Sequence, residues 1–323
     1  MKRIFLVLCL IVGCLSPLWA APCLKVATLH PLLGDLARRI GGNHVQVVDL
    51  LQANGNLHSF EPSPRLIAEA SGAQFLIASG KNLEPYLASL SDALRSGTQP
   101  LEVVNVGSAI PDVLAAGQSE DHHHGDADEA ELPEESASPE EHHHHHGPND
   151  PHWWNSPENM RRAGRLLCHV FRQADPDHAT DYNQALSLWI EQMDGIEAWA
   201  KCQLASIPDE HRILVTGHAA MSHFCKALDF TEVPVQGISR EDEGNPERLA
   251  RTLHNLRLNG ALAVFPEYGS NPKILESISS TLHLPLAEAL VTDGLAPQMT
   301  NFEAMFRHNV TVIKKALEHT PQH

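Results

Sequence analysis

Short apolar runs alternate with segments of helical pattern along both halves of the chain. We interpret the runs as buried strands, because strands that are covered on both faces are apolar without alternation. Strands that alternate with helices imply parallel pairing, so the pattern predicts an α/β fold with two Rossmann-like βα lobes. The predicted strands are 24–29, 45–51, 75–79 and 103–106 in the first lobe, and 213–216, 233–238, 261–266 and 284–290 in the second. The predicted helices between them are 32–40, 64–70, 83–94, 220–228, 246–258 and 272–281.

A single long helix is predicted between the lobes, over residues 180–206. Its apolar residues recur with the i, i+3, i+4 and i+7 spacing of an amphipathic helix, as at Trp189, Met193 and Ile196. At 1.5 Å per residue such a helix is about 40 Å long, and we expect its apolar stripe to pack along both lobes. The predicted organisation is a signal peptide at 1–20, an N-terminal lobe at 21–177, a linking helix at 178–207 and a C-terminal lobe at 208–323.

The first twenty residues have the pattern of a secretory signal peptide. Lys2 and Arg3 precede an apolar run over residues 4–15, and small residues surround Ala20. We expect cleavage after Ala20. The alternative is a lipoprotein, because the four residues that end at Cys14 resemble a lipobox. Either route predicts an exported, periplasmic protein, and the apolar run is short for a transmembrane anchor.

A segment rich in histidine and acidic residues extends from Gln118 to Asp150. It contains eight histidines, eleven carboxylates and neither Lys nor Arg. A segment this polar cannot bury enough apolar surface to fold, so we predict a disordered loop over 118–149. Imidazole and carboxylate are ligands of borderline divalent cations, and two separate histidine runs favour an auxiliary metal-binding role over a solvated acidic loop. The histidines are His122, His123, His124, His142, His143, His144, His145 and His146.

The formal net charge of −17 is concentrated in that segment, which leaves −6 for the rest of the chain. This balance gives no support to nucleic acid as a partner. Four cysteines lie beyond the predicted signal peptide. An oxidising compartment permits disulfides, but four cysteines allow three pairings and their spacing does not choose among them. The absence of a C-x-x-C pair argues against a thiolate zinc site. These cysteines are Cys23, Cys168, Cys202 and Cys225.

Four polar residues stand where parallel sheets place ligands, in the loops that follow strands. His58 follows the second predicted strand, His152 ends the His-rich segment, His218 follows the strand at 213–216, and Asp293 follows the last strand. Two come from each lobe, so a cation could be held in the cleft between the lobes. Three neutral imidazoles and one carboxylate suit tetrahedral Zn²⁺.

The sequences around these four residues resemble the motifs of one family, in order along the mature chain. Residues 58–64 read HSFEPSP and are similar to the H-x-[YF]-E-P-S-P signature of the zinc/manganese substrate-binding proteins of ABC importers. Residues 150–157, DPHWWNSP, resemble the family's D-P-H-x-W-L-[DS]-P. Residues 218–224, HAAMSHF, are similar to H-D-A-F-x-Y-F, residues 265–267 to F-x-E, and residues 293–295 to the start of D-P-L-G.

The resemblance implies two α/β lobes joined by one long helix, and a metal site whose ligands fall on His58, His152, His218 and Asp293. It implies a monomeric transport protein, not an enzyme, that delivers Zn²⁺ (alternatively Mn²⁺ or iron) to an ABC permease of the inner membrane. A His-rich loop before the second ligand is typical of the zinc-importing members. The candidate partners of the imidazole N–H groups are Glu61 and Glu267.

The chain departs from the family pattern at Ala219, His223 and Gly294, which stand where Asp, an aromatic residue and Pro are usual. These departures leave open that His223 binds in place of His218. Two other classes remain open as well: a secreted zinc hydrolase, although H-E-x-x-H and G-x-S-x-G motifs are absent, and a storage or adhesion protein that acts through the His-rich segment alone.

Overall fold

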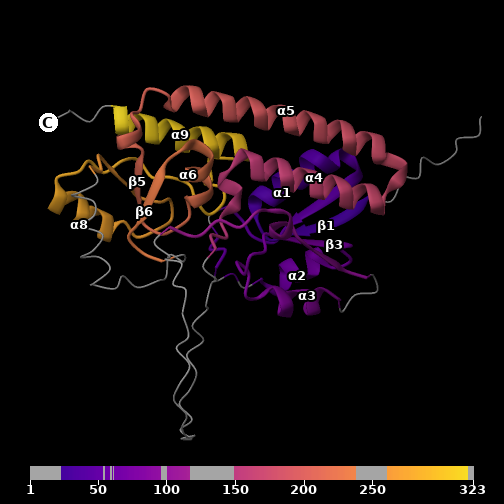
Figure 1. Ribbon diagram of the computed structural model, residues 1–323. Helices are drawn as coiled ribbons and strands as arrows, with labels where there is room; N and C mark the ends of the chain where they lie inside the picture. Colours follow the sequence, from indigo (N-terminus) through magenta and orange to yellow (C-terminus); the bar gives the residue numbers. More distant parts are fainter. Residues whose placement is uncertain are drawn as a thin grey trace, which may run out of the picture.

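The computed structural model describes residues 23–53, 55–58, 60, 62–95, 100–116, 149–237 and 260–318. The predicted signal peptide, residues 118–148 of the His-rich segment, Glu61 and the predicted helix at 246–258 therefore lie outside the described residues. Two parallel sheets stand below a layer of long helices (Figure 1). The predicted α/β class with two lobes is confirmed.

The N-terminal lobe contains a four-stranded parallel sheet in the order β2-β1-β3-β4. The apolar runs form its strands because both faces of the sheet are covered; β3, for example, is buried at every position. The elements are β1 (Leu24–Thr28), α1 (Pro31–Gly41), β2 (Val45–Asp49), α2 (Pro64–Ala70), β3 (Phe75–Ala78), α3 (Leu87–Arg95) and β4 (Glu102–Asn105). Helix α3 begins four residues later than predicted, after Pro85, a residue that disfavours helical φ and ψ for the residue before it.

The C-terminal lobe contains a three-stranded parallel sheet in the order β6-β5-β7. Its elements are β5 (Ile213–Thr216), α6 (Ser222–Leu228), β6 (Thr231–Pro234), β7 (Val264–Phe265) and α8 (Lys273–Leu282). Strand β6 begins two residues earlier than predicted, because the left-handed Asp229 ends α6 and Thr231 already pairs with Ile213.

The predicted fourth strand of this lobe, 284–290, forms two isolated parallel bridges in place of a continuous ladder. Val264 pairs with Leu286, but Glu267 pairs with Leu290, so the register slips by one residue between the bridges. Pro266 lies at the slip and has no N–H to donate, which removes the hydrogen bond that would have continued the ladder.

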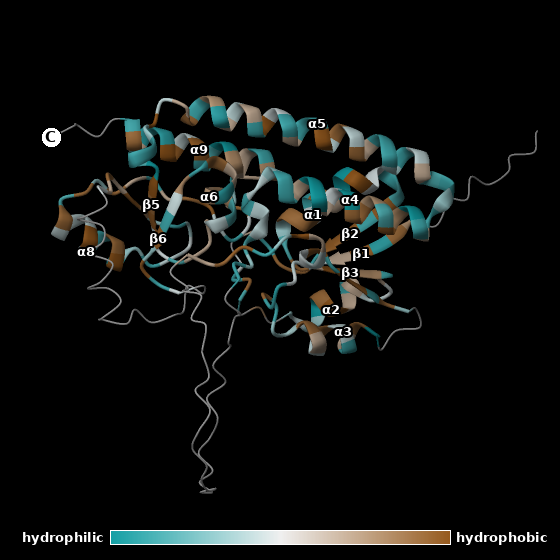
Figure 2. Ribbon diagram, viewed as in Figure 1, coloured by the Kyte–Doolittle hydropathy of each residue, from teal (hydrophilic) through white to brown (hydrophobic). Residues whose placement is uncertain are grey.

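Three long helices cover both lobes on one side (Figure 1). They are α4 (Pro157–Ala174), α5 (Ala179–Leu204) and α9 (Phe302–Glu318). Helix α5 packs against α1 and α4 of the N-terminal lobe and against α9, which follows the last ligand loop of the C-terminal lobe. The expectation that its apolar stripe contacts both lobes is confirmed, and Figure 2 shows hydrophilic residues along its outer face. The amphipathic helix α9 was not predicted.

Trp189 of α5 lies where the three helices meet. Its indole N–H donates to the carbonyl of Met160 on α4 at 2.9 Å, and its ring lies 6.4 Å from that of Phe302 on α9. The short 3₁₀ turns in the described part of the chain are η1 (Gly42–His44), η2 (Val106–Ala109), η3 (Trp153–Asn155), η4 (Pro176–His178) and η5 (Asp209–His211). No helix among the described residues combines the length and apolarity needed to cross a bilayer.

Candidate metal centre

The side chains of His58, His152, His218 and Asp293 meet between the two lobes. One potential ligand atom from each lies within 4.8 Å of the corresponding atoms of the other three. Nε2 of His58 is 3.3 Å from Nε2 of His152, and the Asp293 Oδ1 lies 3.2 Å from the Nε2 of His218 and 3.5 Å from that of His152. All four residues are buried. Three imidazole nitrogens and one carboxylate oxygen therefore face a common point.

His218 and Asp293 lie just beyond the carboxyl ends of strand segments, and His58 and His152 lie in the segments that lead into helices α2 and α4. His58 lies between β2 and α2, His218 two residues after β5, and Asp293 three residues after the bridge at Leu290. His152 precedes the turn η3 that leads into α4. The carboxyl edges of the two parallel sheets thus converge on the site, as expected for open α/β folds.

Carboxylates behind two of the histidines determine which ring nitrogen faces the centre. The Asp150 Oδ1 accepts from Nδ1–H of His152 at 2.7 Å, and Glu267 accepts from both the backbone N–H (3.0 Å) and the Nδ1–H of His218. With the proton held on Nδ1, the lone pair of Nε2 is directed into the site. The structure places Glu267 where the sequence predicted it; Glu61 lies outside the described residues.

The charges around the site are unequal. Burial disfavours the protonated form of His218, but the carboxylates of Glu267 and Asp293 outweigh it and raise the pKa of that imidazole well above its usual value. Asp150 is also buried, yet its hydrogen bond from His152 and the nearby imidazoles lower its pKa. The region behind the imidazoles is thus strongly anionic and attracts a cation.

Two tryptophans that follow His152 form part of the wall of the site, and both are almost fully buried. The Trp154 ring centroid lies 5.4 Å from that of His152, and its Nε1–H donates to the carbonyl of Thr292 at 2.7 Å. Trp153 donates to the carbonyl of Ser79 at 3.0 Å. The Trp154 ring packs beside the His152 imidazole, and the two indole N–H groups tie the segment to both lobes.

Two residues at the site were not recognised in the sequence. Asp150 belongs to the D-P-H motif, and its position two residues before His152 was the available signal. His30 caps α1, because its Nδ1 accepts from the N–H of Leu32 at 3.1 Å; its ring packs 4.2 Å from that of Trp154. Burial lowers the pKa of His30 to about 3 despite the nearby Asp293. The His-Pro start of this helix parallels the Ser63-Pro64 start of α2.

His223 is not part of the cluster, so the alternative in which it replaces His218 is not supported. Its Nε2 donates to the carbonyl of Asp150 at 3.2 Å and its Nδ1 accepts from Asn159 at 3.0 Å. Both ring nitrogens are thereby engaged in a neutral imidazole, and burial lowers its pKa.

The four cysteines beyond the predicted signal peptide carry free thiols.

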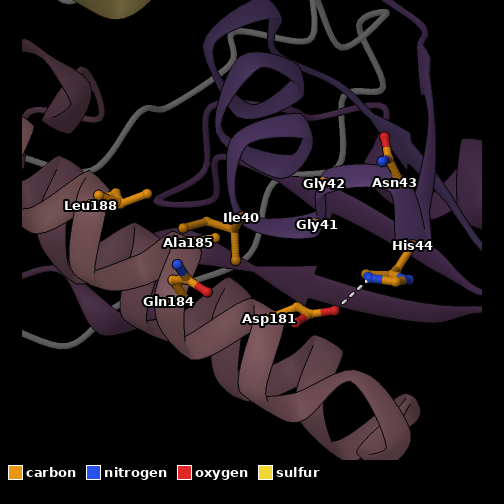
Figure 3. Close-up of a pocket in the computed structure, with 9 residues that line it drawn as sticks. All are labelled: Ile40, Gly41, Gly42, Asn43, His44, Asp181, Gln184, Ala185 and Leu188. Carbon is orange, nitrogen blue, oxygen red and sulfur yellow. Dashed lines mark hydrogen bonds and ion pairs between the residues drawn. The ribbon is translucent and has the colours of Figure 1, made fainter.

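A separate pocket of about 330 Å³ lies between residues 40–44 and α5 (Figure 3). Within the pocket, Nε2 of His44 lies 2.9 Å from Oδ2 of Asp181, the contact marked in Figure 3. Gly41 and Leu188 are among its other lining residues. None of the four clustered residues lines it, so the pocket is distinct from the candidate metal centre.

Two parallel βα lobes with a helix across both, and imidazoles that converge between them, define a substrate-binding protein of a metal importer. The chain belongs to the ZnuA family, described as zinc-uptake complex component A periplasmic, whose model matches residues 26–316. As a transport component it is not an enzyme, and the hydrolase alternative is excluded.

Curated relatives of the chain are named for different metals. It is 22% identical over 302 residues to the metal ABC transporter substrate-binding lipoprotein SsaB of Streptococcus sanguinis, covering 91% of this chain and 89% of that protein. It is 21% identical over 301 residues to the manganese ABC transporter substrate-binding lipoprotein PsaA of Streptococcus pneumoniae (strain ATCC BAA-334 / TIGR4), with the same coverage. It is 25% identical over 272 residues to the iron-binding protein YfeA of Yersinia pestis, covering 84% and 78%.

Solved structures share the fold. The Mn-bound periplasmic metal binding protein from Candidatus Liberibacter asiaticus superimposes with a TM-score of 0.75 at 16% identity, and a crystal structure of ZnuA with a TM-score of 0.72 at 19% identity. Each match covers 91% of this chain and 99% of the other. At these identities the likeness shows the fold, and it does not identify the metal.

Proposed function

We propose that this protein binds Zn²⁺ outside the cytoplasm and delivers it to an ABC permease of the inner membrane. The observation that carries the proposal is the convergence of three imidazole nitrogens and one carboxylate oxygen within 4.8 Å of one another. In this proposal the ligands are His58, His152, His218 and Asp293. Export by the signal peptide, or a lipid anchor at Cys14, would place the monomeric protein on the periplasmic side.

The choice of zinc rests on the chemistry of the donor set. Nitrogen-rich, four-coordinate sites suit Zn²⁺, whereas Mn²⁺ prefers more oxygen ligands and a higher coordination number. The relatives named for manganese and iron make those ions the second candidate. The His-rich segment would act as an auxiliary site that captures or senses metal, with weaker binding because each event must order flexible chain.

Removal of residues 119–147 tests whether the cleft site stands alone. We expect the shortened protein to retain one tight Zn²⁺ site by calorimetry and metal analysis, while the total number of ions bound falls. Mutation of residues that hydrogen-bond metal ligands lowers metal affinity roughly 10–100-fold. Alanine at any of the four proposed ligands should lower the Zn²⁺ affinity of the tight site by more than that.

Three results would count against the proposal. A shortened protein without a tight site would assign binding to the His-rich segment, as in a storage or adhesion protein. Full Zn²⁺ affinity after alanine substitution of His218 or Asp293 would show that the tight site does not lie in the cleft. Preferential retention of Mn²⁺ or iron, when either is offered at equal concentration with Zn²⁺, would show that the transported ion is not Zn²⁺.

A further inference from the structure

Asn155 lies three residues after His152, in the turn η3, and is 1% exposed. Its Nδ2 lies 2.9 Å from the carbonyl oxygen of Ala220 and 3.1 Å from that of Thr292. Because both neighbours are acceptors, only the NH₂ end of the amide can face them, and its two hydrogens serve the two carbonyls.

These two carbonyls belong to the loops that carry the other lobe's proposed ligands. Ala220 comes two residues after His218, and Thr292 immediately precedes Asp293. One buried side chain therefore connects the segment of His152 in the N-terminal lobe to both ligand loops of the C-terminal lobe. The 3.2 Å separation between His218 Nε2 and Asp293 Oδ1 depends on how those loops are spaced.

Each loop is also supported from within its own lobe. The buried Glu232 accepts from the N–H of Ala220 at 3.0 Å, and Asn309 on α9 accepts from the N–H of Val291 at 2.9 Å and donates to its carbonyl at 2.8 Å. Those supports hold each loop in its own lobe, whereas Asn155 joins the two loops to each other across the interlobe boundary.

Leucine occupies this position in the family pattern that residues 150–157 resemble. Leucine is similar in size to asparagine but has no hydrogen to donate, so the bridge is a feature of this chain and not of the pattern. We propose that Asn155 is a positioning residue that sets the spacing of the His218 and Asp293 loops and aligns both with His152. The inference rests on the proposed function, since the quantity it controls is metal binding by those residues.

The test compares N155A and N155L with N159A in the otherwise intact protein. Asn159 is also buried and donates through Nδ2 to two partners, the carbonyl of Trp153 and His223, but it reaches neither ligand loop. We expect Zn²⁺ affinity, measured by competition with a chelator, to fall about tenfold in both Asn155 variants. The visible d–d spectrum of bound Co²⁺ should shift in these variants and stay at the wild-type position in N159A.

The Co²⁺ spectrum distinguishes a change in ligand positions from a general loss of stability. A lower melting temperature alone does not alter the coordination geometry of the metal in the folded protein. Wild-type affinity together with a wild-type Co²⁺ spectrum in folded N155A and N155L would overturn the inference, as would an equal effect in N159A. If N155A does not fold, N155S is measured under the same criteria. H218A is the reference: tight binding that survives in H218A contradicts the proposed function itself, whereas loss in H218A with no change in N155A contradicts the inference alone.

Discussion

His218 has two carboxylates close to its ring, Glu267 behind it and Asp293 beside it. Because these raise the pKa of the His218 imidazole well above its usual value, a proton competes with a cation for Nε2. A cation can bind Nε2 only after that proton leaves, so binding of the ion should release a proton.

We therefore expect Zn²⁺ affinity to rise with pH through the neutral range, by up to about tenfold per pH unit for one displaced proton. Calorimetry in two buffers with different ionisation enthalpies measures the number of protons released. In E267Q the larger of the two raising charges is lost, so fewer protons should be released at pH 7 than in the wild type. Equal heats in the two buffers for the wild-type protein would contradict this prediction.

Glu232 is a buried carboxyl group that supports the loop of His218 from behind. It accepts hydrogen bonds from the loop after β5, including the N–H of Met221 at 2.9 Å and the hydroxyl of Ser222 at 2.8 Å. Burial, reinforced by the charge of Asp150, raises its pKa to about 7 from 4.5. Between these values the folded protein binds more protons than the unfolded chain, so this group makes stability fall as pH rises.

The substitution E232Q removes that titration while it preserves the size of the side chain. We expect the wild-type protein to lose stability relative to E232Q between pH 5 and pH 8, by an amount on the order of 3 kcal/mol. Urea unfolding of both ion-free proteins across this range gives the difference. A stability difference that does not vary with pH would show that Glu232 keeps one protonation state throughout.

At the scale of elements, α4 and α5 each contain one glycine, and the surroundings of the two differ. A Cβ at Gly195 of α5 would meet nothing within 4 Å, whereas a Cβ at Gly164 of α4 would lie 2.6 Å from Cδ1 of Trp189. Trp189 cannot yield easily, because its indole N–H is bonded to α4 and its ring packs near α9. The close approach of α4 to α5 therefore depends on Gly164.

We predict that G195A raises the free energy of unfolding by about 0.5–1 kcal/mol, since alanine is the better helix former and the site is open. G164A should instead lower it by about 1–3 kcal/mol, because the added methyl group displaces Trp189. Thermal or urea unfolding of the two variants measures both effects. The prediction is wrong if the two substitutions change stability in the same direction.

The local pattern of apolar residues was sufficient to predict most helices and strands. Tertiary contacts account for the differences between the predicted and observed elements. The buried runs that became β1, β3 and β5 were recognised because both faces of each strand are covered. The slip at Pro266 was not foreseen, since it depends on which strand lies opposite the missing N–H. Helix α9 was not recognised among the segments that follow Asp293, although its apolar face packs against α5 and α6 through residues such as Phe302 and Phe306.

At the scale of the whole molecule, the placement of the four site residues followed from topology. Parallel strands direct their carboxyl ends to one edge of each sheet, so the loops of His58, His218 and Asp293 were expected at those edges. The contacts behind the ligands were less accessible to sequence reasoning. Glu267 was identified through a motif, whereas the cap formed by His30 and the bridge formed by Asn155 depend on how distant segments approach one another.

The clamp of Asn309 on Val291 also bears on the order in which the protein matures. All four clustered residues are synthesised before helix α9, yet the loop of Asp293 is held by a side chain from that helix. A nascent or truncated chain that ends near residue 300 would contain every cluster residue without the brace for the last of them. For a chain exported as proposed, this brace would form only after the C-terminal segment has crossed the membrane, so helix α9 would complete the site last.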